Sequence, residues 1–209
     1  MKIGLILECA TDGPDWQVYS GWIKRILGED VVVEQSSAVN KKLLIREAGT
    51  RTQRLFAEGC EKVFIIWDLW PAWGVKGAAP SKTNDETGLY ESLTAAGVTN
   101  PCVYLLCVDR MLETLLLVDG SALNAVMQIP KGKKTPGNQN NPYKHADPKS
   151  YLDRWFKQAR KGAYTDYVHA AQIARHANFS RLRQRTAEFP RLEDGLNQYP
   201  CAPPLAWAP

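Results

Sequence analysis

Short apolar runs alternate with amphipathic stretches through the first half of the chain. Four of these runs, at residues 2–7, 31–33, 62–67 and 103–108, are typical of strands buried on both faces. Between them, apolar residues recur at the three- and four-residue spacings of helices packed on a sheet, at 16–27, at 40–59 and from 84 or 85 to 96. The alternation of strand and helix predicts an α/β fold in which helices cover both faces of a parallel sheet.

The pattern changes after residue 110. The spacing predicts one helix over 111–118, and a polar stretch rich in Lys, Gly, Asn and Pro then occupies 130–148. This stretch exceeds an ordinary connection, which is consistent either with a functional loop or with a mobile spacer. Three further helices are expected at 151–161, 164–176 and 179–196. We therefore expect an α/β core at 1–129, a basic loop at 130–148 and a helical extension packed on the core at 149–209.

Composition is ordinary for a globular domain and excludes few classes of function. The chain has 209 residues, 44% of them hydrophobic, and a formal charge of +4, which permits nucleic-acid binding without requiring it. Its apolar runs fall far short of the ~20 residues that cross a bilayer, so we expect no membrane association. The five cysteines lack CxxC spacing, which predicts reduced thiols and a cytoplasmic location.

Acidic residues end two of the predicted strands. Glu8 follows the first and Asp68 follows the third, and parallel sheets bind ligands at this edge. A single acid here is often only a helix cap, but a pair indicates a site for a hard cation. Asp109 and Glu113 also lie one helical turn apart, where like charges repel. Arg110, solvent or a divalent cation would relieve that repulsion.

These acids, together with Asp119 in the leucine-rich stretch, resemble the Toprim-like nucleases related to the overcoming-lysogenisation-defect (OLD) family. The resemblance continues at Asp147-Pro148-Lys149, at 164–174 and at 181–196. It implies a Toprim-like Rossmannoid sheet and a nuclease that acts as the effector subunit of an ATPase-associated anti-phage complex, with possible oligomerisation through the ATPase.

The same resemblance implies the roles of the site residues. Glu8 and Asp68 would hold a first Mg²⁺ or Mn²⁺, and Glu113 with Asp119 would serve a second ion or its water shell. Paired ions activate water and neutralise phosphate charge during phosphodiester cleavage, and oxygen ligands favour Mg²⁺ or Mn²⁺. Lys149 or Lys161 is the expected cation for the phosphate.

Two departures from the family pattern leave an alternative function open. Toprim proteins carry Asp-x-Asp after the third strand, whereas this chain has Trp70 in place of the second acid, and Asp166 stands where a late lysine is expected. The alternative is a catalytically degenerate subunit that binds an ATPase or nucleic acid without cleavage. It would dock through the segment of Trp67, Trp70 and Trp73 and through the basic late helices, whose arginines are Arg175, Arg181, Arg183, Arg185 and Arg191. A second basic cluster, in the central loop, comprises Lys131, Lys133, Lys134, Lys144 and Lys149.

Overall fold

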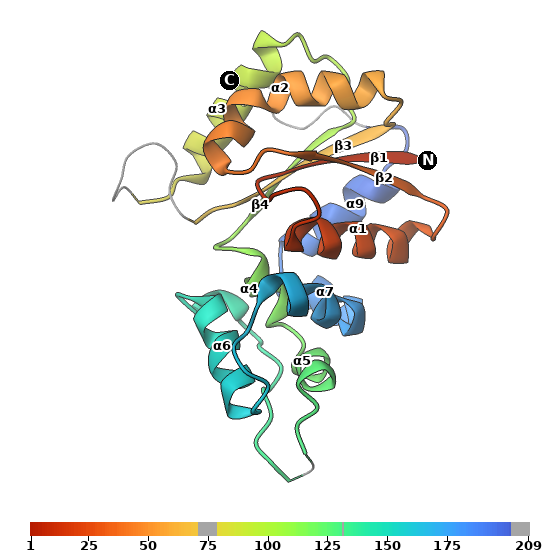
Figure 1. The fold of residues 1–209 in the computed structure, drawn as a ribbon. Coiled ribbons are helices and arrows are strands. Elements are labelled where there is room, and N and C mark those ends of the chain that lie inside the picture. Colours follow the sequence, from red (N-terminus) through yellow and green to blue (C-terminus); the bar gives the residue numbers. More distant parts are fainter. Residues whose placement is uncertain (71–78, 131, 202–209) are drawn as a thin grey trace.

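The computed structural model describes residues 1–70, 79–130 and 132–201. Four parallel strands form one sheet in the order β2-β1-β3-β4 (Figure 1). The strands are β1 (Lys2–Leu7), β2 (Val32–Ser37), β3 (Lys62–Asp68) and β4 (Val103–Val108). The register pairs Leu7 with Ser37 on one side and with Ile66 on the other, so the strands end at a common edge. The predicted α/β class is thus confirmed.

Helices cover both faces of the sheet. The helices α2 (Lys41–Ala57) and α3 (Lys82–Ala95) pack on one face, while α1 (Pro14–Leu27) and α9 (Glu188–Asn197) cover the other (Figure 1). Alternate strand residues supply the two cores: Ile65 faces α2 and α3, whereas Phe64 and Ile66 face α1 and α9. This alternation explains why β1, β3 and β4 contain continuous apolar runs.

The last helix is fixed tightly to the sheet. The buried Lys62 Nζ donates hydrogen bonds to the carbonyl oxygens of Gly195, Leu196 and Gln198, at 2.7–2.8 Å. A Cβ at Gly195 would come within 2.9 Å of the Phe64 ring, so glycine permits this close approach. Residues near the C-terminus therefore form one of the layers around the sheet.

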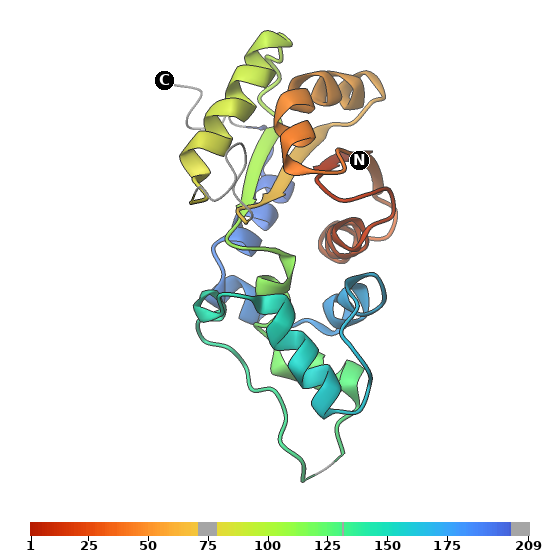
Figure 2. The ribbon, with the colours of Figure 1, turned by 60° about the vertical axis from the view of Figure 1, so that its left-hand side comes forward.

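The remaining helices form a second part beside α1 and α9 (Figures 1 and 2). They are α4 (Leu112–Leu116), α5 (Gly120–Met127), the 3₁₀ turn η1 (Pro142–Lys144), α6 (Pro148–Gln158), α7 (Asp166–His176) and α8 (Phe179–Arg185). Helix α7 packs against both α1 and α5. One hydrophobic core runs from the sheet through α1 into these helices, which rigidly connects the strand ends to α4, α6 and α7.

Three expectations about helix boundaries were wrong. The helix predicted at 111–118 ends at Leu116, and α5 follows with Asp119 as its N-cap. The helix predicted at 179–196 is split into α8 and α9 around Thr186. Helix α3 is capped by Ser81, whose side chain accepts from the Asn84 amide, rather than by Asn84 or Asp85.

The expectation that all five cysteines are free thiols was also wrong. Cys102, which precedes β4, forms a disulfide with Cys201, and their Cα atoms are 5.2 Å apart. Disulfides of this kind are uncommon in cytosolic proteins. Cys9, Cys60 and Cys107 are free thiols. Across the described ranges no helix combines the length and apolarity needed to span a membrane.

Candidate functional site

Glu8 and Asp68 meet at the carboxyl edge of the sheet, as the sequence predicted. Glu8 follows β1 and Asp68 ends β3, and these two strands are neighbours in the sheet. From β1 the chain passes first to β2 on one side of β1 and then to β3 on the other side. This reversal of strand order is the usual ligand position in open α/β sheets. The Asp68 amide donates to Glu8 Oε1 at 3.3 Å, so the two carboxylates come from directly adjacent backbone.

Asp15 adds a third carboxylate to this edge. It lies in the first turn of α1, directly after Pro14, and its charge contributes to the raised pKa values of Glu8 and Asp68. We predicted that this helix starts at residue 16, which left Asp15 in a loop. Pro at the first helical position followed by an acid is a helix-start signal that could have identified it.

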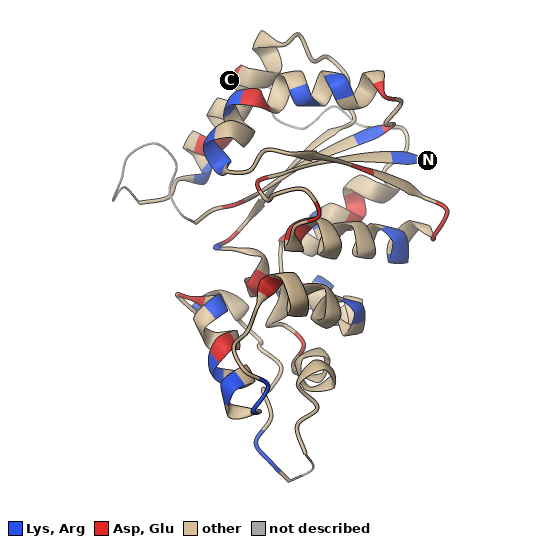
Figure 3. Ribbon diagram, in the orientation of Figure 1, with Lys and Arg blue, Asp and Glu red and all other residues tan. Residues whose placement is uncertain are grey.

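Glu113 is the fourth acid of the group, which we call the acidic cluster: Glu8, Asp15, Asp68 and Glu113. Its side chain is buried in α4, and its charge acts on Asp68. The Tyr164 hydroxyl donates to Glu113 Oε1 at 3.4 Å. Figure 3 shows acidic segments at the strand ends and at the starts of the helices that face them.

The pKa values of all four acids are raised. Burial raises the pKa of Glu8 to about 7, with Asp15 and Asp85 adding to the shift and Lys41 opposing it. Burial likewise raises the pKa of Asp15 to about 6 and holds that of Asp68 well above its usual value, where Asp15, Glu8 and Glu113 add repulsion. Burial also raises the pKa of Glu113. A set of buried and half-buried acids that repel one another is stabilised by any cation that enters.

Lys149 lies beside this cluster, at the start of α6. Its Nζ contacts Asp166 Oδ2 at 2.5 Å. Burial alone would lower the pKa of Lys149, but Asp166, Glu113 and Asp15 outweigh it and raise the pKa. Asp166, found where the family pattern has a lysine, therefore orients a lysine from another helix.

A second lysine approaches the same edge from α2. Lys41 is buried, its Nζ lies 3.5 Å from Asp85 Oδ2, and it donates to the Leu69 carbonyl at 2.8 Å. Trp67 Nε1 also donates to Asp85, at 3.1 Å. The charge of Lys41 lowers the pKa of Glu8. Sequence reasoning missed Lys41, although its position at the start of a helix after β2 places it at the carboxyl edge.

Asp119 does not belong to the cluster, which corrects its assignment as a metal ligand. Its Oδ1 accepts from the Ser121 amide at 2.9 Å, its Oδ2 accepts from the Asn178 amide at 3.0 Å, and Oδ1 also pairs with Arg181. Although burial opposes it, these contacts lower the pKa of Asp119. Oδ1 thus caps α5, and both oxygens join α5 to the start of α8.

The donors of the cluster fit a hard divalent cation in kind. All are carboxylate oxygens, and within the described residues the buried Glu8 Oε2 has no hydrogen-bond partner, which leaves this oxygen available to a ligand. No three His, Cys, Asp or Glu side chains in the described ranges are yet gathered tightly enough to hold an ion. Binding of an ion would require these carboxylates to rotate toward one another, against the repulsion that also raises the pKa of Asp68.

Trp70 lies outside the buried cluster. Its side chain is 44% exposed, and the Arg110 guanidinium lies 5.7 Å from its ring centroid. It is therefore a surface aromatic residue beside the acidic cluster and not a member of it. Trp73, the third tryptophan of this segment, falls outside the described residues.

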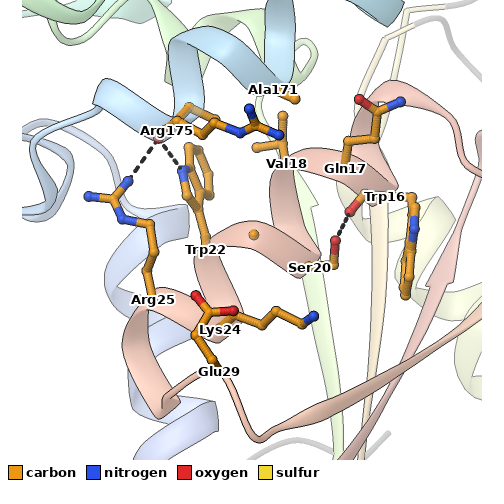
Figure 4. A pocket seen from close by; sticks show the side chains of 12 residues that line it. Trp16, Gln17, Val18, Ser20, Trp22, Lys24, Arg25, Glu29, Ala171 and Arg175 are labelled. Carbon is orange, nitrogen blue, oxygen red and sulfur yellow. Dashed lines mark hydrogen bonds between the residues drawn. The ribbon is translucent and has the colours of Figure 1, made fainter.

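One cavity lies apart from the acidic cluster. It measures about 590 Å³ and lies between α1 and α7, where Trp16, Lys24, Arg25 and Arg175 are among its lining residues (Figure 4). Trp22 Nε1 and the Arg25 guanidinium donate to the Ala174 carbonyl and tie the two helices together. None of the four clustered acids lines this cavity, so it is a feature separate from the candidate site.

Residues 23–197, most of the chain, match the family described as Domain of unknown function (DUF4276). No curated protein and no solved structure matches the chain. The matched range contains Asp68, Glu113 and Lys149, but it begins after Glu8 and Asp15.

Proposed function

The chain belongs to the DUF4276 family, and we propose that it is a divalent-metal-dependent nuclease that hydrolyses phosphodiester bonds in DNA or RNA. The observation that carries the proposal is the convergence of Glu8, Asp15, Asp68 and Glu113 at the edge where β1 and β3 end. Each has a raised pKa, because burial and mutual repulsion disfavour its charge. Such clustering of perturbed acids is characteristic of catalytic sites.

On this proposal, Glu8 and Asp68 hold a Mg²⁺ or Mn²⁺ ion together with Asp15, and Glu113 serves a second ion or its water shell. A bound divalent cation supplies an activated water and neutralises phosphate charge. Glu8 and Asp15 must lose their protons to bind the cation. Because their pKa values are about 7 and about 6, cation affinity should rise steeply between about pH 5 and pH 8.

Lys149 is the residue we assign to the phosphate of the substrate. Its raised pKa keeps Nζ charged throughout the neutral range, and Asp166 fixes its direction. Lys41, which pairs with Asp85, places a second ammonium group near Glu8 and lowers the pKa of Glu8. Positive groups beside the acids favour the approach of a polyanion.

The remainder of the proposal follows the family resemblance. The chain would act in the cytoplasm as the effector subunit of an anti-phage complex, beside an ATPase subunit. Trp70 and Arg110 offer an exposed aromatic and cationic surface beside the site for such a partner. Co-purification of an ATPase with the wild type, and its loss with Trp70→Ala, would support this part.

Titration calorimetry with Mg²⁺ and Mn²⁺, followed by cleavage assays on plasmid and single-stranded substrates, tests the proposal directly. We expect Glu8→Gln and Asp68→Asn to lose both metal binding and cleavage. Asp12→Asn is the matched control, since it removes an acid at the same edge from an exposed residue with φ of 58°, a conformation that Asn tolerates.

Folded wild-type protein that binds neither ion, alone or with its ATPase partner, would refute the nuclease. It would favour the alternative of a docking subunit. Cleavage that survives in Glu8→Gln and Asp68→Asn would place the chemistry elsewhere in the molecule.

A further inference from the structure

Two adjoining cavities run along α6, away from the acidic cluster. They measure about 520 and 220 Å³, and both are lined by Lys134, Trp155 and Gln158. The larger one continues to Lys133 and Arg160, and the smaller one to Tyr151 and Arg154. We call this continuous surface the α6 groove.

The α6 groove is positively charged and contains no opposing acid. Lys133, Lys134, Arg154 and Arg160 line it, and neither lining includes Asp or Glu. Within the ranges that the structure describes, none of these four cations forms an ion pair with an acidic side chain. The groove therefore offers four charges to an anionic ligand.

The other basic cluster foreseen from the sequence is different. Arg181 pairs with Asp119 and Arg183 pairs with Glu193, so these arginines hold the C-terminal helices together. Lys133 and Lys134, by contrast, form no ion pair within the described ranges and keep their charge for a ligand. Figure 3 shows the blue segments of α6 and of the loop that runs beneath its end.

Aromatic side chains line the same groove. Trp155 is half-buried: it packs against the hydrophobic core and also contributes to both cavities. Tyr151 lies one helical turn before it, and the Arg154 guanidinium sits 5.5 Å from the Tyr151 ring centroid. With 3.6 residues per turn, Tyr151, Arg154, Trp155 and Gln158 form a single stripe on α6.

We propose that the α6 groove binds single-stranded nucleic acid, with phosphates on its Lys and Arg side chains and an unpaired base on Trp155. Cations that follow a backbone, together with an aromatic platform, are how proteins bind single strands without sequence preference. A base within a duplex is already stacked on its neighbours and is not free to stack on the indole. This inference deepens the proposed nuclease function. It rests on that function only where it identifies the bound single strand as the strand that the enzyme would cut.

The groove is a site separate from the acidic cluster. Lys149, which faces Glu113 and Asp166, is on the opposite flank of α6 from the stripe of Tyr151 and Trp155. None of the four clustered acids lines either cavity, so binding to the groove can be measured without cleavage.

Fluorescence anisotropy of a labelled oligothymidylate of about 12 nucleotides, measured in EDTA, provides the test. Trp155→Leu should weaken binding roughly 5-fold or more, because stacking of a base is lost. The double variant Lys134→Gln/Arg154→Gln should reduce the slope of log Kd against log salt by about 1.4, since each lost phosphate contact removes ~0.7. Lys157→Gln is the matched control, because Lys157 is 63% exposed on the same helix and pairs with Asp153 outside the groove.

Each result decides the inference separately from the nuclease. Wild type that fails to bind the oligonucleotide in EDTA, or groove variants that bind like Lys157→Gln, would overturn it even if cleavage occurs. Thymidine monophosphate that competes as strongly as the oligonucleotide would indicate a free-nucleotide pocket instead. Binding to phosphatidylserine vesicles that is lost in the groove variants, without oligonucleotide binding, would indicate a membrane surface.

Discussion

Replacement of Glu8 by Gln should stabilise the metal-free protein near neutral pH. Gln keeps the size of the side chain and an oxygen that accepts from the Asp68 amide, but it carries no charge. The pKa of Glu8 is raised from 4.5 to about 7, chiefly by burial. An acid with a raised pKa in the folded state holds its proton more tightly there than in the unfolded chain, so stability falls as pH rises from about 4.5 to about 7.

The size of the effect follows from this shift. Each pKa unit corresponds to about 1.36 kcal/mol, so ionised Glu8 opposes folding by up to ~3 kcal/mol near pH 8. Asp15 and Asp68 titrate together with Glu8 and take up part of that energy. We therefore expect Glu8→Gln to exceed the wild type by ~2–3 kcal/mol near pH 8, and the difference to approach zero near pH 4.5.

Urea unfolding in EDTA at several pH values measures this difference. Asp12→Asn controls for removal of a negative charge at the same edge and should leave the pH dependence unchanged. Added Mg²⁺ should raise the unfolding midpoint of the wild type by mass action and leave Glu8→Gln where it was. Equal or lower stability of Glu8→Gln near pH 8 would refute the claim that the ionised cluster opposes folding.

Three further substitutions test other contacts. Asp119→Asn removes the ion pair with Arg181 and should lower the free energy of unfolding by ~1–2 kcal/mol. Cleavage should not change, and a folded variant that no longer binds metal would restore Asp119 as a ligand. Lys62→Met leaves three backbone carbonyls at the end of α9 without their donor, and should cost ~2–4 kcal/mol in urea unfolding; a neutral result would contradict that anchoring role. Cys102→Ser opens a disulfide that spans 99 residues and should cost up to ~4–5 kcal/mol, visible as a lower Tm that reductant reproduces in the wild type; an unchanged Tm would exclude the bond.

The strands were largely predictable because their apolar runs are complete. The observed β1 and β4 have the predicted bounds. The second strand was placed at 31–33, whereas β2 extends over Val32–Ser37. Its second half contains Gln35, Ser36 and Ser37, because β2 is an edge strand with half-exposed positions. A polar edge strand lacks the apolar signal on which the prediction depended.

The helical part was less predictable because apolar composition conceals helix ends. The run Leu115–Val118 is continuous in the sequence, yet it contains the end of α4 and the turn before α5. Asp119 is the acid at this turn, and it was interpreted as a ligand although an acid before a new helix is also an N-cap. The distinction depends on Arg181, which is distant in sequence and meets Asp119 only in the folded chain.

The site was half predictable, and the missed half has a common cause. Glu8 and Asp68 were found because acids at strand ends stand out in the sequence. Asp15 and Lys41 were missed because they open helices, in α1 and α2. In a strand-helix unit, however, the first turn of the helix lies at the same edge as the end of the strand. The first turn of each following helix should therefore be searched together with the strand ends.

Asp15 also changes the meaning of Trp70. The family resemblance leads one to expect a second acid two residues after Asp68, and the chain has Trp70 there. On the proposed function, α1 supplies the missing carboxylate through Asp15. The charge of Asp15 raises the pKa of Asp68 more than the charge of Glu8 or of Glu113 does. The side chain at position 70 is then free to face solvent. Asp15→Asn should consequently abolish cleavage as completely as Asp68→Asn, whereas Trp70→Ala should leave cleavage by the isolated protein intact; the reverse pattern would favour the docking subunit.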